Sequence, residues 1–123
     1  MGKPSPKPLR WVGSSQDDLS SFPDAVKRTI GFALRAAQNG GKSPDAHPLQ
    51  GFGGAGVLEI VEDHDGNTYR AVYTVKLAGV IYVLHAFQKK SKRGIKTPQH
   101  ELDVIRHRLE TARRMHEDFG TQQ

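Results

Sequence analysis

Three β-rich runs separated by short connectors constrain the fold of this chain more than any other feature. They lie at residues 57–62, 69–76 and 79–87. The pair Asp65-Gly66 joins the first two runs, and Leu77-Ala78-Gly79 is short enough to join the second to the third. Connections of this length join antiparallel neighbours, because a parallel pair needs a crossover of about a dozen residues or more. The sequence therefore predicts a three-stranded antiparallel meander.

Before the meander, the sequence predicts a short strand, a helical turn and a longer helix. The strand is expected at 9–13 and the turn at 16–20. The longer helix shows apolar residues at helical spacing up to residue 38. We expect Ser21 as its N-cap, because a serine hydroxyl accepts hydrogen bonds from free amides, and Asn39-Gly40-Gly41 as its end. Residues 42–56, rich in proline and glycine, are predicted as a loop.

After the meander, Thr97-Pro98 is typical of a helix start, with threonine as N-cap and proline in the first helical position. An apolar stripe at helical spacing follows: Leu102, Ile105, Leu109 and Ala112. The pattern is lost at about Glu117. We therefore predict one domain at 9–116 between a disordered tail at 1–8 and a frayed tail at 117–123. Its expected class is α+β, a small antiparallel sheet packed against helices on one face.

Composition restricts the chemistry open to this chain. Cysteine is absent from the sequence, which excludes disulfides, thiolate catalysis and cysteine-based zinc sites. Lysine and arginine outnumber aspartate and glutamate by 18 to 13, a formal charge of +5, so an anionic partner is expected. No apolar run approaches the roughly 18 residues of a membrane span, and a signal-peptide core is absent. We expect a cytoplasmic protein without a membrane partner.

A basic cluster follows the last β-rich run. It contains Lys89, Lys90, Lys92, Arg93 and Lys96, with no acidic residue among them. Like charges at this spacing repel one another unless a polyanion offsets them. We interpret the cluster as binding nucleic acid, against the alternative of a solvated loop between strand and helix. A membrane surface is disfavoured because no amphipathic segment with bulky anchors adjoins the cluster.

Arg70 is the first candidate for chemistry within the β-rich runs. Its neighbours are apolar or small, and it shares a strand face with Val72 and Thr74. A guanidinium in mid-sheet must pair with an acid, reach solvent or bind a ligand. One interpretation is an ion pair with an acid of the neighbouring strand, Glu59, Glu62 or Asp63. The other is a fork of donors for a phosphate on an open sheet face.

His85 is the second candidate, near the end of the last run. Histidines in apolar strands are commonly buried and structural. The adjacent Lys89 and Lys90 favour a functional interpretation, because cationic neighbours and burial both stabilise the neutral imidazole that a general base needs.

No cofactor and no metal are expected. Residues 51–56 match GxGxxG, but a dinucleotide fingerprint needs a strand before it and a helix after it. Here a loop comes first and a strand follows. The six histidines contain no HExxH motif and no pair four residues apart.

With these residues in view, the chain resembles the RelE/ParE superfamily of bacterial toxins, and within it the HigB-like, phage-derived branch. The pieces that carry the resemblance are FPDAVKRTIGFALRAAQNG at 22–40, HPLQGFGGAGVLEIVEDHDGNTYRAVYTV at 47–75 and GVIYVLHAFQKKSKRGIKTP at 79–98. The resemblance covers about residues 9–115. It implies a RelE-like fold and a toxin that enters the ribosomal A site and cleaves mRNA.

The resemblance also implies roles and partners. The family's sheet arginine falls on Arg70, the basic residues at its last strand's end fall on Lys89 and Lys90, and HigB-like members are similar at His85. A helix-turn-helix antitoxin, the ribosome and mRNA are the implied partners. RelE has a C-terminal tyrosine that helps activate the 2′-hydroxyl, whereas residues 92–123 contain none. The base would then be His85, a lysine of lowered pKa, or another tyrosine: Tyr73 or Tyr82.

Three functions stay open from the sequence. The first is a metal-independent endoribonuclease with His85 as base or acid, Arg70 with Lys89 or Lys90 on the phosphate, and the remaining cations along the RNA backbone: Lys92, Arg93 and Lys96. The second is a ParE-like inhibitor of gyrase, and the third a non-catalytic regulatory protein of a phage or mobile element. Basic groups converging with His85 on one sheet face favour the first. An ion-paired Arg70 and a buried His85 favour the others.

Overall fold

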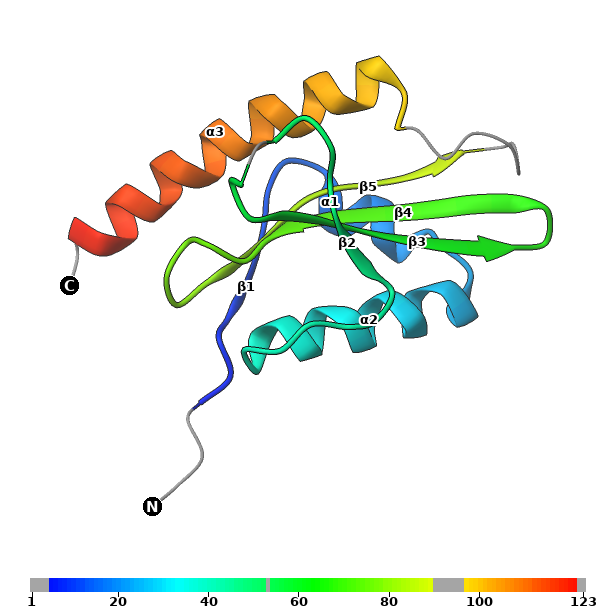
Figure 1. The fold of residues 1–123 in the computed structure, drawn as a ribbon, viewed down its shortest axis with the longest axis horizontal. Coiled ribbons are helices and arrows are strands. Elements are labelled where there is room, and N and C mark those ends of the chain that lie inside the picture. Colours follow the sequence, from blue (N-terminus) through cyan, green and yellow to red (C-terminus); the bar gives the residue numbers. More distant parts are fainter. Residues whose placement is uncertain (1–4, 53, 90–96, 122–123) are drawn as a thin grey trace.

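The computed structural model describes residues 5–52, 54–89 and 97–121. In this part of the chain five strands form one sheet in the order β1-β5-β4-β3-β2. All neighbouring pairs are antiparallel except β1 and β5, which are parallel. Figure 1 shows this sheet with its three helices, and the α+β class is thereby confirmed. The elements are β1 (Leu9–Trp11), α1 (Ser15–Ser20), α2 (Asp24–Gln38), β2 (Ala46–Pro48), β3 (Val57–His64), β4 (Asn67–Thr74), β5 (Ile81–Lys89) and α3 (Gln99–Thr121).

The predicted meander is formed by β3, β4 and β5. Asp65 and Gly66 connect β3 to β4 with φ angles of 48° and 82°. Positive φ at both central residues is typical of a two-residue hairpin turn whose twist matches the flanking strands. The β4–β5 connection contains Gly79 at a φ of 81°, where a side chain would strain the backbone. Both hairpin predictions are confirmed.

The segment 42–56, predicted as a loop, contains the short edge strand β2. Ala46 pairs with Ile60, and Pro48 pairs with Leu58. The loop prediction is therefore wrong at 46–48. A strand of three residues is too short to show alternation, and proline argues against a central strand while being tolerated at an edge. Burial of Ala46 attaches this strand to the core.

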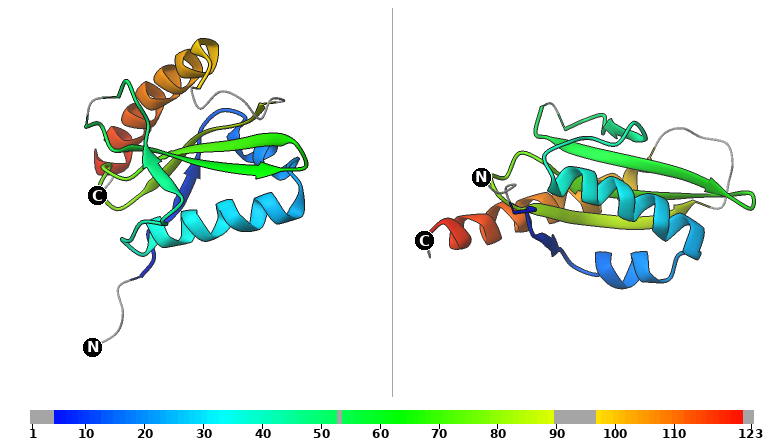
Figure 2. Two further views of the ribbon diagram at one scale, coloured as in Figure 1. Left: turned by 45° about the vertical axis from the view of Figure 1, so that its right-hand side comes forward. Right: turned by 90° about the horizontal axis from the view of Figure 1, so that it is seen from below.

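Helices cover both faces of the sheet, as the views in Figures 1 and 2 show. On one face α2 packs over Ala71 and Tyr73 of β4. On the other, α3 packs over Val72 of the same strand. The expectation of helices on one face is wrong for α3. Strand β5 is apolar on both faces and every residue of β4 except Asn67 is buried, so each face needs cover.

The junction between α1 and α2 differs from the predicted cap. Ser21 ends α1 as its C-cap, and its hydroxyl donates to the Asp18 carbonyl at 2.7 Å. Pro23 holds the N-cap position of α2. The serine is engaged by the preceding short helix, so the prediction of Ser21 as the N-cap of α2 is wrong. The apolar stripe of α2 is buried as expected: Val26, Ile30, Ala33, Leu34 and Ala37.

Helix α3 begins at Gln99, one residue after the predicted first helical residue Pro98, and the Thr97 hydroxyl bonds to Glu59 and Arg70. The amides of Glu101 and Leu102 donate to the Pro98 carbonyl at 3.0 Å, and Ile105 and Leu109 are buried against the sheet. The helix continues to Thr121, past the end of its apolar pattern. Although α3 has 23 residues, neither it nor another helix in the described ranges is long and apolar enough to cross a membrane.

Tyr73 provides a test of the core beneath α2. Its side chain is fully buried, and its hydroxyl has no hydrogen-bond partner among the described residues. Leaving a buried polar group unsatisfied costs about 1–3 kcal/mol. Tyr73→Phe removes only this oxygen, so we expect the free energy of unfolding in urea to rise by about 1 kcal/mol.

Tyr82→Phe is the matched control. The Tyr82 ring is equally buried, but its hydroxyl lies 3.2 Å from His116 Nδ1. Losing this contact is expected to lower the free energy of unfolding by about 1 kcal/mol. Equal losses of stability in the two variants would contradict the assignment of an unsatisfied hydroxyl at Tyr73.

Candidate functional site

The register between β4 and β5 brings the predicted site residues to the face under α3. Arg70 pairs with Phe87, and Thr68 pairs with Lys89. Directly paired residues project to the same side of an antiparallel sheet. His85 lies beside them, with its ring stacked on Phe87 at a centroid distance of 5.0 Å. Arg70, His85 and Lys89 thus lie on one sheet face.

A β-bulge in β5 determines the direction of His85. Val72 pairs with His85 while its successor Tyr73 pairs with Val83, which leaves Leu84 as the extra residue. In a regular strand Leu84 and His85 would point to opposite faces. Here Leu84 joins the core under α3, and His85 contacts side chains of α3. Bulges next to functional sites commonly re-aim a side chain in this way.

The Arg70 guanidinium is buried and ion-paired. Arg70 is 1% exposed, and its Nη1 lies 3.1 Å from Glu59 Oε1. The Thr97 hydroxyl donates to Glu59 Oε2 at 2.7 Å and accepts from Arg70 Nη1 at 3.3 Å. The predicted ion pair is confirmed with Glu59. The alternative of an open sheet face is wrong, because Thr97 and α3 cover this face.

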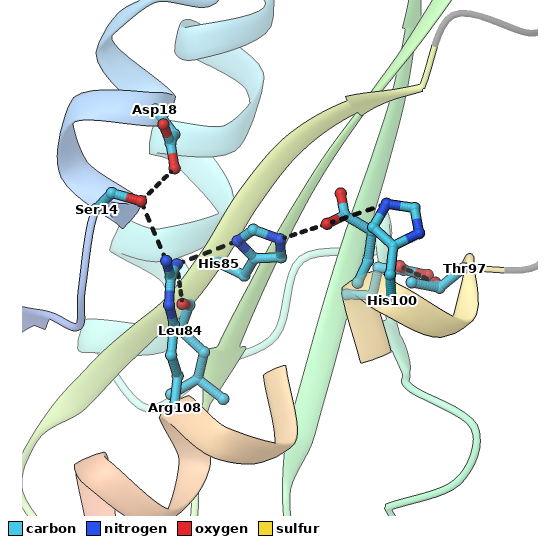
Figure 3. Close-up of polar contacts among 9 residues, drawn as sticks. Ser14, Asp18, Leu84, His85, Thr97, His100 and Arg108 are labelled. Carbon is cyan, nitrogen blue, oxygen red and sulfur yellow. Dashed lines mark hydrogen bonds and ion pairs between the residues drawn. The ribbon is translucent and has the colours of Figure 1, made fainter. Parts of the chain in front are cut away.

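Both ring nitrogens of His85 are hydrogen-bonded, as Figure 3 shows. Arg108 Nη1 lies 3.1 Å from Nδ1, and Glu101 Oε1 lies 3.1 Å from Nε2. A guanidinium can only donate, so Nδ1 accepts and the ring proton of the neutral imidazole is assigned to Nε2, which donates to Glu101.

Burial keeps His85 in the neutral form. The residue is 7% exposed. Desolvation is the main cause that lowers the pKa of His85, assisted by the positive charge of Arg108, while Glu101 and Asp18 oppose it. The lowered pKa and the contribution of burial agree with the sequence expectation. The cation that lowers the pKa of His85 is Arg108 rather than Lys89, and Lys90 lies outside the described residues.

Sequence reasoning missed the two α3 residues that hold His85. Glu101 and Arg108 are seven residues apart, so they lie two turns apart on one side of α3, adjoining the apolar stripe. Two charged residues at this spacing, on either side of the buried Ile105, indicate polar side chains at the edge of the buried helix face. This is the sequence signal that could have identified them. Arg108 also donates to the Leu84 carbonyl at 3.0 Å and to Ser14 Oγ at 3.1 Å. Ser14 Oγ in turn donates to Asp18 at 2.7 Å, which extends the network to α1 (Figure 3).

The other predicted residues are only partly placed. Lys89 is half-buried at the end of β5. Four cations of the basic cluster lie outside the described residues: Lys90, Lys92, Arg93 and Lys96. The alternative tyrosine bases fit the task poorly, because burial raises the pKa of Tyr73 to about 12 and also raises the pKa of Tyr82. Tyr73 moreover lies on the opposite sheet face.

The described residues contain no group of three or more histidine, cysteine, aspartate or glutamate side chains that could hold a metal ion. The glycine-rich segment leads into β3 rather than into a helix, so it lacks the context of a dinucleotide fingerprint. The arrangement on this face is a neutral imidazole oriented by a carboxylate, with a guanidinium on its other nitrogen and a second one nearby.

Comparison with known proteins gives a family match. Residues 17–110 match the family model described as Phage derived protein Gp49-like (DUF891). This range includes Arg70, His85, Glu101 and Arg108. A search of curated proteins and a search of solved structures found no match.

The buried ion pair predicts the effect of removing Glu59. The Glu59 and Arg70 side chains are 11% and 2% exposed, so Glu59→Ala leaves a guanidinium buried without its carboxylate. Breaking a buried pair in this way costs about 3–5 kcal/mol. We expect that loss in the free energy of unfolding for Glu59→Ala. The neutral pair Glu59→Gln/Arg70→Gln should lose much less, because it keeps hydrogen-bonding groups of similar size. Equal stability of Glu59→Ala and wild type would contradict the pair.

The lowered pKa of His85 predicts a pH dependence of stability. Below the unfolded-state pKa of about 6.5, the unfolded chain binds a proton that folded His85 excludes. Stability contributed by neutral His85 is therefore lost as pH falls below about 6.5 towards the folded-state pKa. Urea denaturation between pH 7.5 and 5 should show a steeper fall for wild type than for His85→Gln. Parallel curves would contradict a lowered pKa.

Proposed function

Because the chain belongs to the Gp49-like family of phage-derived proteins, a family related to toxins of toxin–antitoxin systems, we propose that it is such a toxin and that it cleaves mRNA. The cleavage is proposed to be metal-independent and to take place on the ribosome. The observation that supports it most is the oriented, neutral His85 beside Arg70 on one sheet face.

The proposed reaction is an attack of the RNA 2′-hydroxyl on the adjacent phosphorus. The bond from the 2′-oxygen to phosphorus forms, the bond from phosphorus to the 5′-oxygen breaks, and a 2′,3′-cyclic phosphate and a 5′-hydroxyl result. A base must take the 2′-proton, cations must stabilise the extra negative charge, and an acid must protonate the leaving oxygen. An imidazole with an ordinary pKa of about 6.5 suits the first task better than a lysine near about 10.4.

We assign His85 as the base, with Glu101 orienting the ring and stabilising the imidazolium that forms. Lys89 or Lys90 contributes positive charge to the phosphate. Arg70 is buried and its charge is compensated by Glu59, so its role is to hold Glu59 and Thr97 in place beside the site. The remaining cations follow the RNA backbone: Lys92, Arg93 and Lys96. The proton on His85 returns to the leaving 5′-oxygen, directly or through water, so the enzyme is unchanged after one cleavage.

The proposed partners are the ribosome with its mRNA and a helix-turn-helix antitoxin. A small basic nuclease gains most from a partner that presents the RNA in a reactive geometry, because positioning supplies a large part of the rate enhancement. The described face under α3 is occupied by the protein's own helix, so RNA has little free surface there in the unbound chain. The antitoxin is proposed to act by covering the basic face or by blocking entry into the ribosome.

A second candidate is gyrase inhibition or a non-catalytic regulatory role. It is favoured by the Arg70–Glu59 pair and by the burial of His85, since both residues then have complete structural roles. Fold alone does not separate the candidates, because one fold supports unrelated activities.

Primer extension on mRNA, with and without 70S ribosomes, tests the proposal. Arg70→Ala is a poor variant for this purpose, because it leaves Glu59 buried without its cation. The double variant Glu59→Gln/Arg70→Gln removes both charges and leaves no buried charge unpaired, so it tests the role of the charges without a large loss of stability. We expect ribosome-dependent cuts from wild type, and rates lower by about 10²–10⁴ for His85→Gln. The neutral pair keeps His85 and should cut at a rate much closer to that of wild type.

Arg114→Gln is the control, because Arg114 is exposed on α3. It should cut as wild type does. Full cutting by His85→Gln would overturn the assignment of the base. Absence of cuts from a wild-type protein that still arrests growth would favour gyrase or another target.

A further inference from the structure

Arg108 differs from Arg70, the other guanidinium of the site, in having only uncharged acceptors. Its guanidinium donates to the Leu84 carbonyl, His85 Nδ1 and Ser14 Oγ at 3.0–3.1 Å. Among the described residues no carboxylate lies within ion-pair distance of it, and Asp18 is reached only through Ser14. Arg70, by contrast, is neutralised directly by Glu59. Arg108 is therefore the guanidinium in the site whose charge is available to an anion.

The surroundings of Arg108 leave a way in from solvent. Ser14 and Gly13 are exposed, whereas His85 is 7% exposed. Gly13 has a φ of 57°, and a Cβ there would lie 2.7 Å from Arg108 Nε. The chain at residue 13 thus packs closely against the guanidinium, and its positive φ favours glycine there. Arg108 is itself half-buried. Its Nη2 donates to the hydroxyl of the exposed Ser14, and its Nη1 donates to His85 Nδ1.

We propose that Arg108 is an anion-responsive cap on His85, which binds an RNA phosphodiester and in doing so releases His85 Nδ1. This inference rests on the proposed function, since it names the phosphate-binding residue of the same site. In the free protein Arg108 Nη1 occupies the Nδ1 lone pair, and His85 cannot act as a base. When a phosphate engages the guanidinium, the bond to Nδ1 is given up.

The exchange is favourable because a phosphate is the stronger acceptor. Hydrogen bonds between a guanidinium and a phosphate are charge-assisted on both sides and frequently bidentate, whereas the present acceptors are a carbonyl, an imidazole and a hydroxyl. The uncapped Nδ1 then faces the bound phosphodiester. Nε2 keeps its proton and continues to donate it in a hydrogen bond to Glu101. Nδ1 is therefore the ring nitrogen that can accept the 2′-proton. Substrate binding and activation of the base are coupled in one side chain.

The test follows the His85 ring by NMR while a short single-stranded RNA, 2′-O-methylated at every position and therefore uncleavable, is added. In wild type the RNA should raise the pKa of His85, because a cation leaves Nδ1 and a phosphate arrives. In Arg108→Met the pKa should already be higher without RNA, and RNA should change it little. The affinity of this variant for the RNA should fall at least about tenfold, the effect of losing charge-assisted hydrogen bonds.

Arg114→Met serves as the matched control on the exposed side of α3 and should respond as wild type does. If Arg108→Met does not fold, Arg108→Lys keeps a charge but loses the planar fork, and its response should be reduced. An equal RNA-induced shift in wild type and in the Arg108 variants would overturn the proposal, as would a wild-type His85 that does not respond. The expected NMR pattern together with uncut ribosomal mRNA would sustain the anion-responsive cap and overturn the endoribonuclease function.

Discussion

The β-bulge at Leu84 places two successive residues of β5 under α3, and the polar contacts of the site depend on it. Leu84 supplies core volume and a carbonyl for Arg108, while His85 meets Glu101 and Arg108. A regular strand would turn one of the two towards α2. Because β5 pairs with strands on both sides and carries α1 and α3 against it, this local irregularity fixes the relation of α3 to the sheet.

Electrostatic balance explains why the face under α3 can be both buried and functional. A charge in this environment must be paired or hydrogen-bonded. The carboxylate of Glu59 compensates the positive charge of Arg70. The carboxylate of Glu101 is placed to compensate the positive charge that His85 gains when it is protonated. Arg108 is held by neutral acceptors near exposed residues. An anion can therefore bind its guanidinium without breaking an ion pair. The same contacts that stabilise α3 on the sheet therefore control access to the base.

Much of the fold could be predicted from local pattern. The meander, both hairpins, α2 and the start of α3 follow from alternation, helical spacing and turn residues. Strand β2 cannot be predicted because three residues at an edge carry too little pattern. The position of α3 cannot be predicted because β5 is apolar on both sides, so its pattern does not show which face a helix covers. Arg70 and His85 were found as polar interruptions of apolar strands. Glu101 and Arg108 were not, because their role depends on a bulge and a helix position that only tertiary structure defines.

The central claim, attack by the RNA 2′-hydroxyl with His85 as the base, is tested most directly by removing that hydroxyl. An mRNA carrying a single 2′-deoxynucleotide at a mapped cut would be presented to the protein on 70S ribosomes. We expect cleavage at that position to be abolished while neighbouring cuts persist, and the products of unmodified mRNA to end in a 5′-hydroxyl and a 2′,3′-cyclic phosphate or 3′-phosphate. Undiminished cleavage at the deoxynucleotide, or 5′-phosphate products, would contradict the account.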